Sequence, residues 1–486
     1  MKRLLSYLLI IFLYASASAQ ETQTKRALLA NGETLYFINP AYVDSLAKMI
    51  TEGEVYGRIR SNTFNFKWAN EDANHETHLV SGLGASLVYK SATLHDFDFK
   101  TALFYSYAFF NDTNNPVNAF KPGKDTLSRF NYVNNKDKSM AVLGEAYVRY
   151  SGMKKSEITL GRQIVNTFYT KPNDTKMVPN TFDALVFSTE IIPDTEIQLA
   201  YLDKQKLRDH EKSHAVLMVG DANSSSAVQP QWSENDDSAM HKGLTYSALK
   251  AAGKPTDAAL IIAEIENNSV KNLEIDASFY TVPSLLSQFM GELNYAFKLK
   301  NSLTITPAIR YIKQFDNGAG KVGGASYTGN TSGYKNPDSL ASQMLAARIV
   351  AELDAYKLNL GYTHIFDEAD LITPWRGFPT SGYTRSMGIY NWRANTQSYR
   401  LELQVNANDE GIYKDVFIQT SVLYVNGDKE KFVSLDYMYY YLGFVQNIPA
   451  FENLQWRLRL GYADFIDKRD DDFNYLDSRF ELNYLF

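Results

Sequence analysis

The last twelve residues, 475–486, read YLDSRFELNYLF and decide the fold class. One parity of this stretch carries the large apolar side chains Leu476, Phe480, Leu482, Tyr484 and Phe486. The other parity carries polar side chains, namely Arg479, Glu481 and Asn483. Because successive side chains of a strand point to opposite faces, the stretch predicts a strand with one apolar and one polar face that ends on an aromatic ring.

The same alternation recurs along the whole chain. It predicts eighteen strands, near 53–66, 77–90, 97–110, 139–150, 156–163, 181–189, 195–204, 257–268, 273–281, 287–299, 303–315, 342–354, 356–367, 397–406, 415–424, 432–446, 453–463 and 475–486. An even number of strands suits a closed barrel, and closure removes the exposed sheet edges. We therefore predict an all-β fold, a transmembrane antiparallel β-barrel of about 18 strands over residues 53–486.

The connections between these strands fall into two alternating classes. Short links such as 151–155, 190–194, 270–272 and 301–302 alternate mostly with long polar links such as 111–138, 205–256, 316–341 and 368–396. Short periplasmic turns and longer outer loops are typical of bacterial outer-membrane barrels. One link, 282–286, is short on the side predicted to be outside.

The N-terminus predicts export. Lys2 and Arg3 precede an apolar run over 4–14, and Ala17-Ser18-Ala19 then supplies an A-x-A cleavage site. Residues 1–19 are thus predicted to be a cleaved signal peptide, and 20–52 a periplasmic segment with a short helix within 40–50. The terminal Phe486 looks like the mark by which barrel-assembly machinery recognises its clients. We expect the chain in a bacterial outer membrane, in contact with lipid and lipopolysaccharide.

Composition excludes several classes of protein. Without residues 1–19, 47 Lys plus Arg face 55 Asp plus Glu, a net charge of −8, which argues against nucleic acid as a partner. The absence of cysteine excludes disulfides and thiol catalysis. After the signal peptide no apolar run approaches the 18 residues or so of a spanning helix. Abundant Tyr (33) and Phe (28) fit aromatic girdles around a barrel.

Arginine is frequent on the parity that faces away from lipid. Arg58 and Arg60 share one face of the first strand, and Arg457 and Arg459 share one face of the strand before the last. Because the first and last strands of a closed barrel are neighbours, these four and Arg479 are predicted to form a basic wall in the lumen. Further inward arginines are predicted on other strands: Arg149, Arg310, Arg348 and Arg400.

A row of guanidinium groups offers carboxylates successive bidentate partners, each weak enough in a wet lumen to be released. The wall therefore predicts passive diffusion of small hydrophilic solutes, with a preference for anionic or carboxylate-bearing ones. An alternative stays open, in which the arginines only pair with lumenal acids such as Glu145, Glu292, Glu402, Asp436 and Glu481.

One segment carries a resemblance to a known family. The strand end Gly161-Arg162-Gln163, followed by KPNDTKMVPNTF over 171–182, resembles the corresponding stretch of the OprD-like outer-membrane porins. The resemblance implies an 18-stranded channel with a basic ladder, whose loop 164–180 folds inward and places Arg162, Asp174 and Lys176 at a constriction. Lys176 stands where arginine is common in that family, so an ammonium group replaces a guanidinium group that could bind a carboxylate with two hydrogen bonds. Related major porins are cation-leaning, and the acidic composition keeps that alternative open.

Other function classes find less support in the sequence. His210 and His214, beside Asp209, have metal-like spacing but fall in the longest predicted loop, so we predict neither an enzyme nor a metal centre. The enzyme alternative would lose activity on replacement of His210, His214 or His241. Acidic clusters at 470–472 and at Glu234, Asp236 and Asp237 could hold calcium, but are more often solvated; no other cofactor is expected. A structural or adhesin barrel, and a homotrimer as against a monomer, also stay open.

Overall fold

Alternating strands organise almost the whole chain. The structure, a computed structural model, describes residues 26–29, 34–36, 40–71, 76–112, 126–173, 177–220, 235, 237–408, 410–431, 436–451, 453–466 and 473–486. The predicted signal peptide lies outside these residues.

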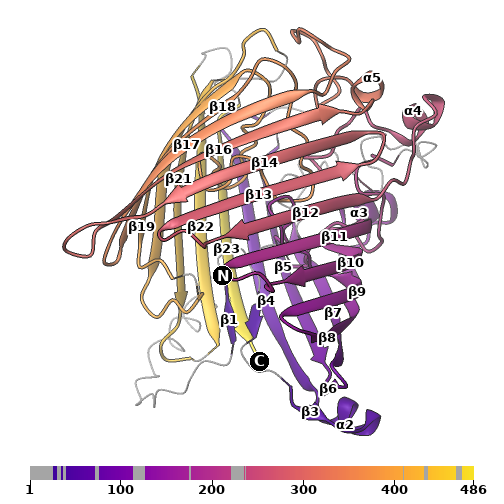
Figure 1. The fold of residues 1–486 in the computed structure, drawn as a ribbon. Helices are drawn as coiled ribbons and strands as arrows, with labels where there is room; N and C mark the ends of the chain where they lie inside the picture. Colours follow the sequence, from indigo (N-terminus) through magenta and orange to yellow (C-terminus); the bar gives the residue numbers. More distant parts are fainter. Residues whose placement is uncertain are drawn as a thin grey trace.

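Eighteen long antiparallel strands form one closed barrel in the described part of the chain (Figure 1). They are β4(Glu54–Trp68), β5(His78–Lys90), β7(Phe97–Asn111), β8(Ser139–Met153), β9(Ser156–Gln163), β10(Thr181–Thr189), β11(Thr195–Lys206), β12(Leu260–Asn267), β13(Leu273–Val282), β14(Leu286–Tyr295), β16(Thr304–Asp316), β17(Ser342–Leu353), β18(Tyr356–Ile365), β19(Thr396–Val405), β20(Phe417–Asn426), β21(Tyr437–Asn447), β22(Leu454–Phe465) and β23(Tyr475–Leu485). Each corresponds to one predicted strand, so the fold prediction is confirmed. The link between β13 and β14 is as short in the structure as the sequence predicted.

Short elements complete the described residues. They are the strands β1(Arg26–Leu28), β2(Thr34–Tyr36), β3(Tyr42–Val43), β6(Thr93–Leu94) and β15(Phe297–Lys298) and the helices α2(Leu46–Thr51), α3(Arg129–Asn135), α4(Tyr246–Ala251) and α5(Gly320–Gly323). None of the helices described is long and apolar enough to cross a membrane.

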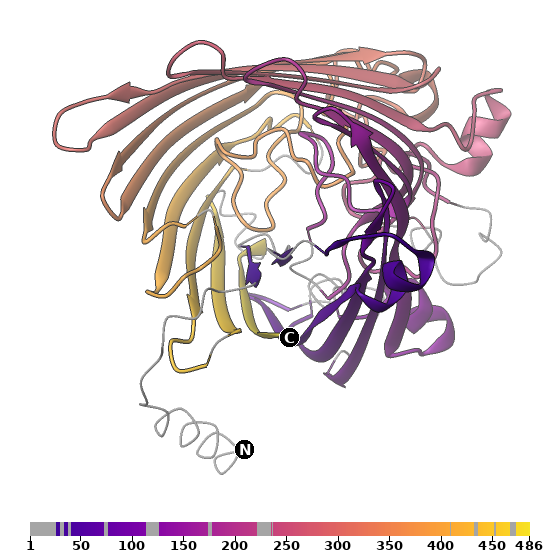
Figure 2. The same ribbon diagram turned by 60° about the horizontal axis from the view of Figure 1, so that its bottom comes forward.

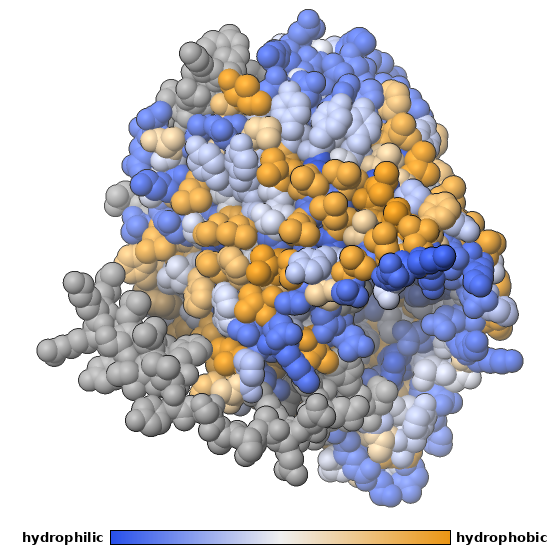
Figure 3. Space-filling model, turned by 90° about the vertical axis from the view of Figure 1, so that its left-hand side faces the viewer, coloured by the Kyte–Doolittle hydropathy of each residue, from blue (hydrophilic) through white to orange (hydrophobic). Residues whose placement is uncertain are grey.

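The two faces of the wall differ as the alternation predicts. On β4, Ile59 is 53% exposed, whereas its neighbours Arg58 and Arg60 are each 3% exposed. On β23, Phe480 and Tyr484 point outward in the same way. Figure 3 shows hydrophobic residues gathered across the middle of one side of the barrel. This outer band is the surface expected to meet lipid chains.

The barrel closes between its last residue and its first long strand. Gly57 and Phe486 exchange both backbone hydrogen bonds, with N···O distances of 2.9 and 3.0 Å. A Cβ on Gly57 would lie 2.6 Å from the Phe486 ring and 2.1 Å from the Ser86 carbonyl oxygen. The missing side chain of Gly57 therefore makes room for the terminal ring.

Gly57→Val is expected to impair closure, because its branched side chain must displace either Phe486 or the β5 backbone. The fraction of protein that keeps the compact mobility of a folded barrel on unheated gels should fall strongly. Gly291→Val is the matched control, since a Cβ at Gly291 would meet only the Phe289 ring, at 3.5 Å. Equal folded fractions for the two variants would contradict this account of the seam.

Two kinds of segment enter the barrel (Figure 2). From one end, β1 and β2 pair as a separate two-stranded sheet, and the Leu28 carbonyl accepts a hydrogen bond from Gln455 Nε2 (3.1 Å). Part of the segment predicted as periplasmic thus contacts the lumenal face of β22. From the other end, residues 164–173 and 366–395 lie against inward-facing side chains. Both kinds of segment therefore contact the lumenal face of the barrel wall.

Candidate pore lining

Five of the predicted arginines come together on three adjacent strands. Arg58 and Arg60 belong to β4, Arg479 to β23, and Arg457 and Arg459 to β22. β23 pairs with both neighbours, so that Arg459 lies opposite Arg479, and Arg60 lies opposite Asn483. This set is called the arginine wall below.

Two carboxylates sit within the arginine wall. Glu481 binds Arg459 and lies 4.0 Å from Arg457 Nη1. Asp477 binds Arg479 through Nη2 (2.5 Å) and Nε (2.8 Å). Five guanidinium groups and two carboxylates thus share this face, and ion pairs join Arg457, Arg459 and Arg479 to the two carboxylates.

The remaining predicted arginines make ion pairs on other strands. Arg149 binds Asp98 (2.6 Å) and Glu157 (3.4 Å). Arg310 and Arg348 share one carboxylate, Glu292, and Arg400 binds Glu402 (3.1 Å). These side chains lie in the lumen, but each has an acidic neighbour.

Three of these arginines also hold a long loop inside the barrel. Arg310 Nη1 donates to the carbonyl oxygens of Pro379 (2.9 Å) and Ser381 (2.8 Å). Arg348 donates to the carbonyl oxygen of Gly382 (3.1 Å), and Arg400 donates to the carbonyl oxygen of Arg385. The acceptors all belong to loop 366–395, between β18 and β19. A basic ladder on this side therefore acts as the anchor of a loop.

Loop 366–395 crosses the lumen and carries cations of its own. A Cβ on Gly388 would lie 3.7 Å from Arg479 Nη2, so the tip of the loop reaches the arginine wall. Arg376 binds Asp237 of loop 207–259, and Arg385 stacks 3.7 Å over the Phe378 ring. The strand alternation did not predict Arg376 and Arg385, because the side chains of loop residues do not alternate between two faces.

Loop residues 164–173 pack against loop 366–395. The backbone N–H of Gly377 donates to Tyr169 O (2.9 Å), and that of Lys171 donates to Trp375 O (3.1 Å). The Tyr169 ring packs edge-on against Tyr280 of β13, with centroids 4.6 Å apart. The two loops form one packed unit inside the lumen.

Carboxylates line the opposite wall. Glu196, Glu266, Asp276 and Glu292 are register partners in turn across β11, β12, β13 and β14. Like charges directly opposite each other destabilise a sheet, so this acidic row is costly to the fold. In the order of strands around the barrel, the acidic row lies half a circumference from the arginine wall.

Solved structures share this architecture, although no protein-family model and no curated protein sequence matches the chain. OccK8 (OprE) of Pseudomonas aeruginosa has a TM-score of 0.67 at 14% identity, covering 90% of this chain and 99% of that chain. OccAB3 of Acinetobacter baumannii gives 0.67 at 12% identity, with 90% and 100% covered. A BenF-like porin from Pseudomonas fluorescens Pf-5 gives 0.67 at 11% identity, with 90% and 99% covered.

The chain has the fold of the OprD-like outer-membrane porins. These neighbours are channels rather than enzymes. The OprD-like fold is the one that the stretch at 161–182 predicted.

One predicted constriction residue needs correction within the OprD-like barrel. Arg162 lies at the end of β9 on the parity of Leu160, which is 62% exposed on the outer face. Its guanidinium group binds Asp183 (2.7 Å) and Ser213 (2.8 Å) on that face. The alternation of β9 thus turns Arg162 away from the lumen. The other two predicted constriction residues lie outside the described residues: Asp174 and Lys176.

The two histidines with metal-like spacing contact each other in the OprD-like barrel. His210 Nδ1 lies 2.8 Å from His214 Nε2. Within the described residues no group of three or more His, Cys, Asp or Glu could hold a metal ion. Of the predicted calcium ligands, Asp237 binds Arg376, and the others fall outside the described residues.

His241 is buried in loop 207–259. Its Nδ1 accepts the Gly243 N–H (3.1 Å), which leaves Nε2–H to donate to the Gly324 carbonyl oxygen (3.0 Å). Burial lowers the pKa of His241 to about 4. Protonation would set a second N–H against that of Gly243, so the folded loop holds the neutral ring.

This predicts a loop whose docking weakens in acid. The pKa of His241 is about 4 in the docked loop and 6.5 when the ring is exposed to water. Between pH 6.5 and about pH 4 the ring therefore binds a proton only in the undocked loop, and the free energy that favours docking falls as pH falls, by up to roughly 3 kcal/mol. Hydrogen exchange near His241 should accelerate on acidification in the native protein relative to His241→Gln at the same pH. Parallel exchange in both proteins at every pH would contradict the assignment.

Proposed function

We propose that the chain is an outer-membrane porin through which small hydrophilic solutes diffuse passively, with a preference for solutes that carry a carboxylate. The arginine wall is the observation that supports this preference, because it places five guanidinium groups on the lumenal face of three adjacent strands. Guanidinium groups bind carboxylates in bidentate geometry and remain charged at any physiological pH.

Similar structures support a solute channel. One is OpdK of Pseudomonas aeruginosa, solved with vanillate, at 11% identity and a TM-score of 0.65, covering 89% of this chain and 98% of that chain. Vanillate carries one carboxylate. A barrel of this fold can therefore admit such an anion, and the arginine wall gives this chain the matching chemistry.

Planar bilayers test the proposal. Purified protein should give ohmic current steps, and the reversal potential in a salt gradient should have the sign of anion selectivity. Absence of steps from folded barrels would remove the porin proposal and favour a structural or adhesin barrel.

The acidic row favours a second candidate, a cation-leaning general porin. Its four carboxylates lie on four adjacent strands. Arg310 on the following strand is the register partner of Glu292 and ends the row. In that case the same bilayers give a reversal potential of cation selectivity. The barrel would stand, and the arginine wall would serve only to balance Glu481 and Asp477.

The membrane partners belong to the same proposal. We take Phe486 as the residue read by barrel-assembly machinery, and the outward apolar band as the surface that meets lipid and lipopolysaccharide. That band suits a monomer and a homotrimer equally. Cross-linking in native membranes distinguishes the two assemblies.

A further inference from the structure

Helix α2 lies at one end of the barrel (Figure 1) and has an exposed apolar side. Leu46 and Ile50, one turn apart, are 70% and 61% exposed, and none of the helix residues is buried. Lys48 lies on the opposite side, because two residues turn a helix by roughly 200°, and it pairs there with Asp44 (3.0 Å). An amphipathic helix can lie flat where a membrane meets water, with its apolar side toward the lipid.

Tyr89 holds α2 on the lipid side of the barrel wall. Tyr89 has the parity of Leu87, which is 49% exposed on the outer face of β5. Its hydroxyl donates to the Ile50 carbonyl oxygen (2.7 Å), and the Ala92 N–H donates to the Met49 carbonyl oxygen (3.0 Å). Outward tyrosines near strand ends belong to the aromatic girdle at the membrane–water interface. The end of α2 therefore lies at the level of that interface.

The position of α2 also indicates which leaflet it meets. The helix docks on the link between β5 and β7, residues 91–96, and it precedes the first long strand, β4. Short links face the periplasm in outer-membrane barrels. The leaflet on that side of an outer membrane consists of phospholipid, whereas lipopolysaccharide occupies the other leaflet. Phospholipid is therefore the lipid nearest to α2.

An apolar hollow of about 510 Å³ opens on the outer face of the same wall. Its lining includes one register row across β4, β5, β7 and β8, in which large and small side chains alternate: Ile59, Ala85, Tyr105 and Ala141. Leu87, Leu103, Leu143 and Phe486 extend the lining. Ala85 lies four residues from Tyr89, roughly 13 Å along β5 and farther from α2. The hollow thus lies deeper in the membrane than the helix.

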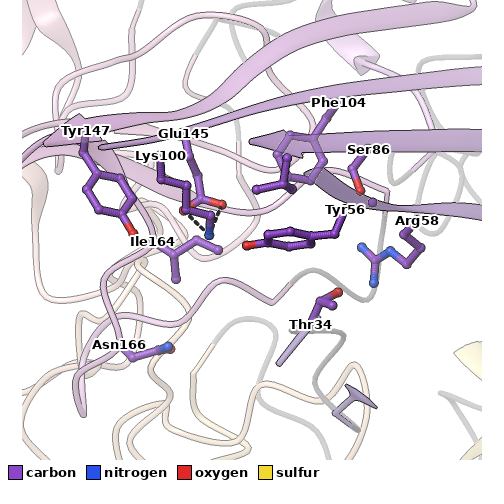
Figure 4. A pocket seen from close by; sticks show the side chains of 12 residues that line it. Thr34, Tyr56, Arg58, Ser86, Lys100, Phe104, Glu145, Tyr147, Ile164 and Asn166 are labelled. Atoms are coloured by element: carbon purple, nitrogen blue, oxygen red, sulfur yellow. Dashed lines mark hydrogen bonds and ion pairs between the residues drawn. The ribbon is translucent and has the colours of Figure 1, made fainter. Parts of the chain in front are cut away.

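The chemistry of the hollow suits hydrocarbon. The described residues that line it carry no charge, and most of them are apolar. The lumenal face of the same strands is polar by contrast, with Arg58 and the Lys100–Glu145 ion pair (3.0 Å; Figure 4). An acyl chain can fill the outer hollow without desolvating a charge.

We propose that α2 and this hollow form one binding surface for a phospholipid of the periplasmic leaflet. One acyl chain lies in the hollow, and the glycerol and headgroup lie beside Tyr89 and the apolar side of α2. The wall presents its deep apolar part and its interfacial part in the order in which such a lipid presents its chain and its headgroup. The proposal goes beyond the porin function, since it concerns the outer face and not the solutes that pass.

Nitroxide labels on α2 test the interfacial part. The chain has no cysteine, so Leu46→Cys and Ile50→Cys each give a single labelled site in the full-length protein. The barrels are reconstituted in vesicles of phosphatidylethanolamine and phosphatidylglycerol. Collision with oxygen, which concentrates in the bilayer, relative to collision with a water-soluble nickel chelate should be severalfold higher at both sites than at Lys48→Cys, the matched control on the charged side.

Two outcomes would contradict this placement. Equal collision ratios at the three sites would place the whole helix in water and overturn the proposal. Protection of Leu46→Cys and Ile50→Cys from both reagents would also overturn it, because protein, such as a second copy of the chain, would then cover this side.

Filling the hollow tests the acyl-chain part. In Ala85→Leu/Ala141→Leu, the fraction of barrels that keep one bound phospholipid in native mass spectrometry should fall severalfold, because the added side chains occupy the space of the chain. The matched control is Ala347→Leu/Ala351→Leu, which enlarges two outward alanines of β17 that do not line the hollow. Equal retention in the two variants, in barrels shown to be folded by gel mobility, would overturn the site.

A second arm distinguishes the source of the chain. In vesicles that also contain lipopolysaccharide, the retained lipid should still be phospholipid, and retention of lipopolysaccharide in its place would overturn the proposal. Current steps report the porin function separately, so normal steps in barrels that retain no phospholipid reject this surface alone.

Discussion

Replacing Arg58, Arg60, Arg457 and Arg459 together with glutamine is expected to invert the ion selectivity of the pore. The four replacements remove four positive charges from the arginine wall and leave its carboxylates Glu481 and Asp477 in place. Field lines are concentrated in a narrow low-dielectric channel, where a change of this size outweighs distant surface charge. The reversal potential in a salt gradient should change sign.

A fifth replacement separates wall charge from damage to the barrel. Adding Glu481→Gln removes one negative charge from the wall and keeps the Arg479–Asp477 pair, so the reversal potential should move back toward zero. Folding of both variants is checked by gel mobility. An anion-selective reversal potential in the quadruple variant would show that the wall does not set selectivity, and would transfer attention to Arg376 and Arg385.

Replacing residues 378–391 with a short Gly-Ser linker is expected to raise single-channel conductance, roughly twofold or more, because the segment crosses the lumen. The Phe378 and Trp392 rings are stacked near the two ends of the segment, with centroids 5.0 Å apart. The linker length is chosen to span the backbone between residues 377 and 392. Arg310 and Arg348 keep Glu292 as a partner, so the wall that anchors the loop remains paired.

The matched control replaces α4, Tyr246–Ala251, with a Gly-Ser segment of the same length. This helix lies outside the outline of the barrel in Figures 1 and 2, and its loss should leave conductance unchanged. If both replacements leave conductance unchanged, loop 366–395 does not limit the current.

The strands could be predicted because each obeys one local rule. In β23 the pleat alone decides that Phe480 points to lipid and Arg479 to the lumen, without reference to any other strand. The same rule placed the arginines of β4 and β22. That these arginines lie on one wall follows from the closure of the barrel, which makes the first and last long strands neighbours. The resemblance places Arg162 in the constriction, whereas the alternation of β9, in which Leu160 points outward, places it on the outer face.

The inward course of loop 366–395 could not be predicted in this way. Loop 366–395 folds inward through carbonyl groups that accept from Arg310 and Arg348, and a backbone acceptor has no mark in the sequence. The acidic row was missed for a related reason. Its residues have the inward parity, but the row exists only through the register of four strands, and register depends on turns that parity does not determine.

The seam between Gly57 and Phe486 has a practical consequence for anyone who labels this protein. An affinity tag appended to the C-terminus would extend from the residue whose amide and carbonyl close the sheet, and would compete with the docking of its ring. The exposed turn around Gly253, just after α4, is the better insertion point, because a Cβ there meets nothing within 4 Å and the helix stands clear of the wall.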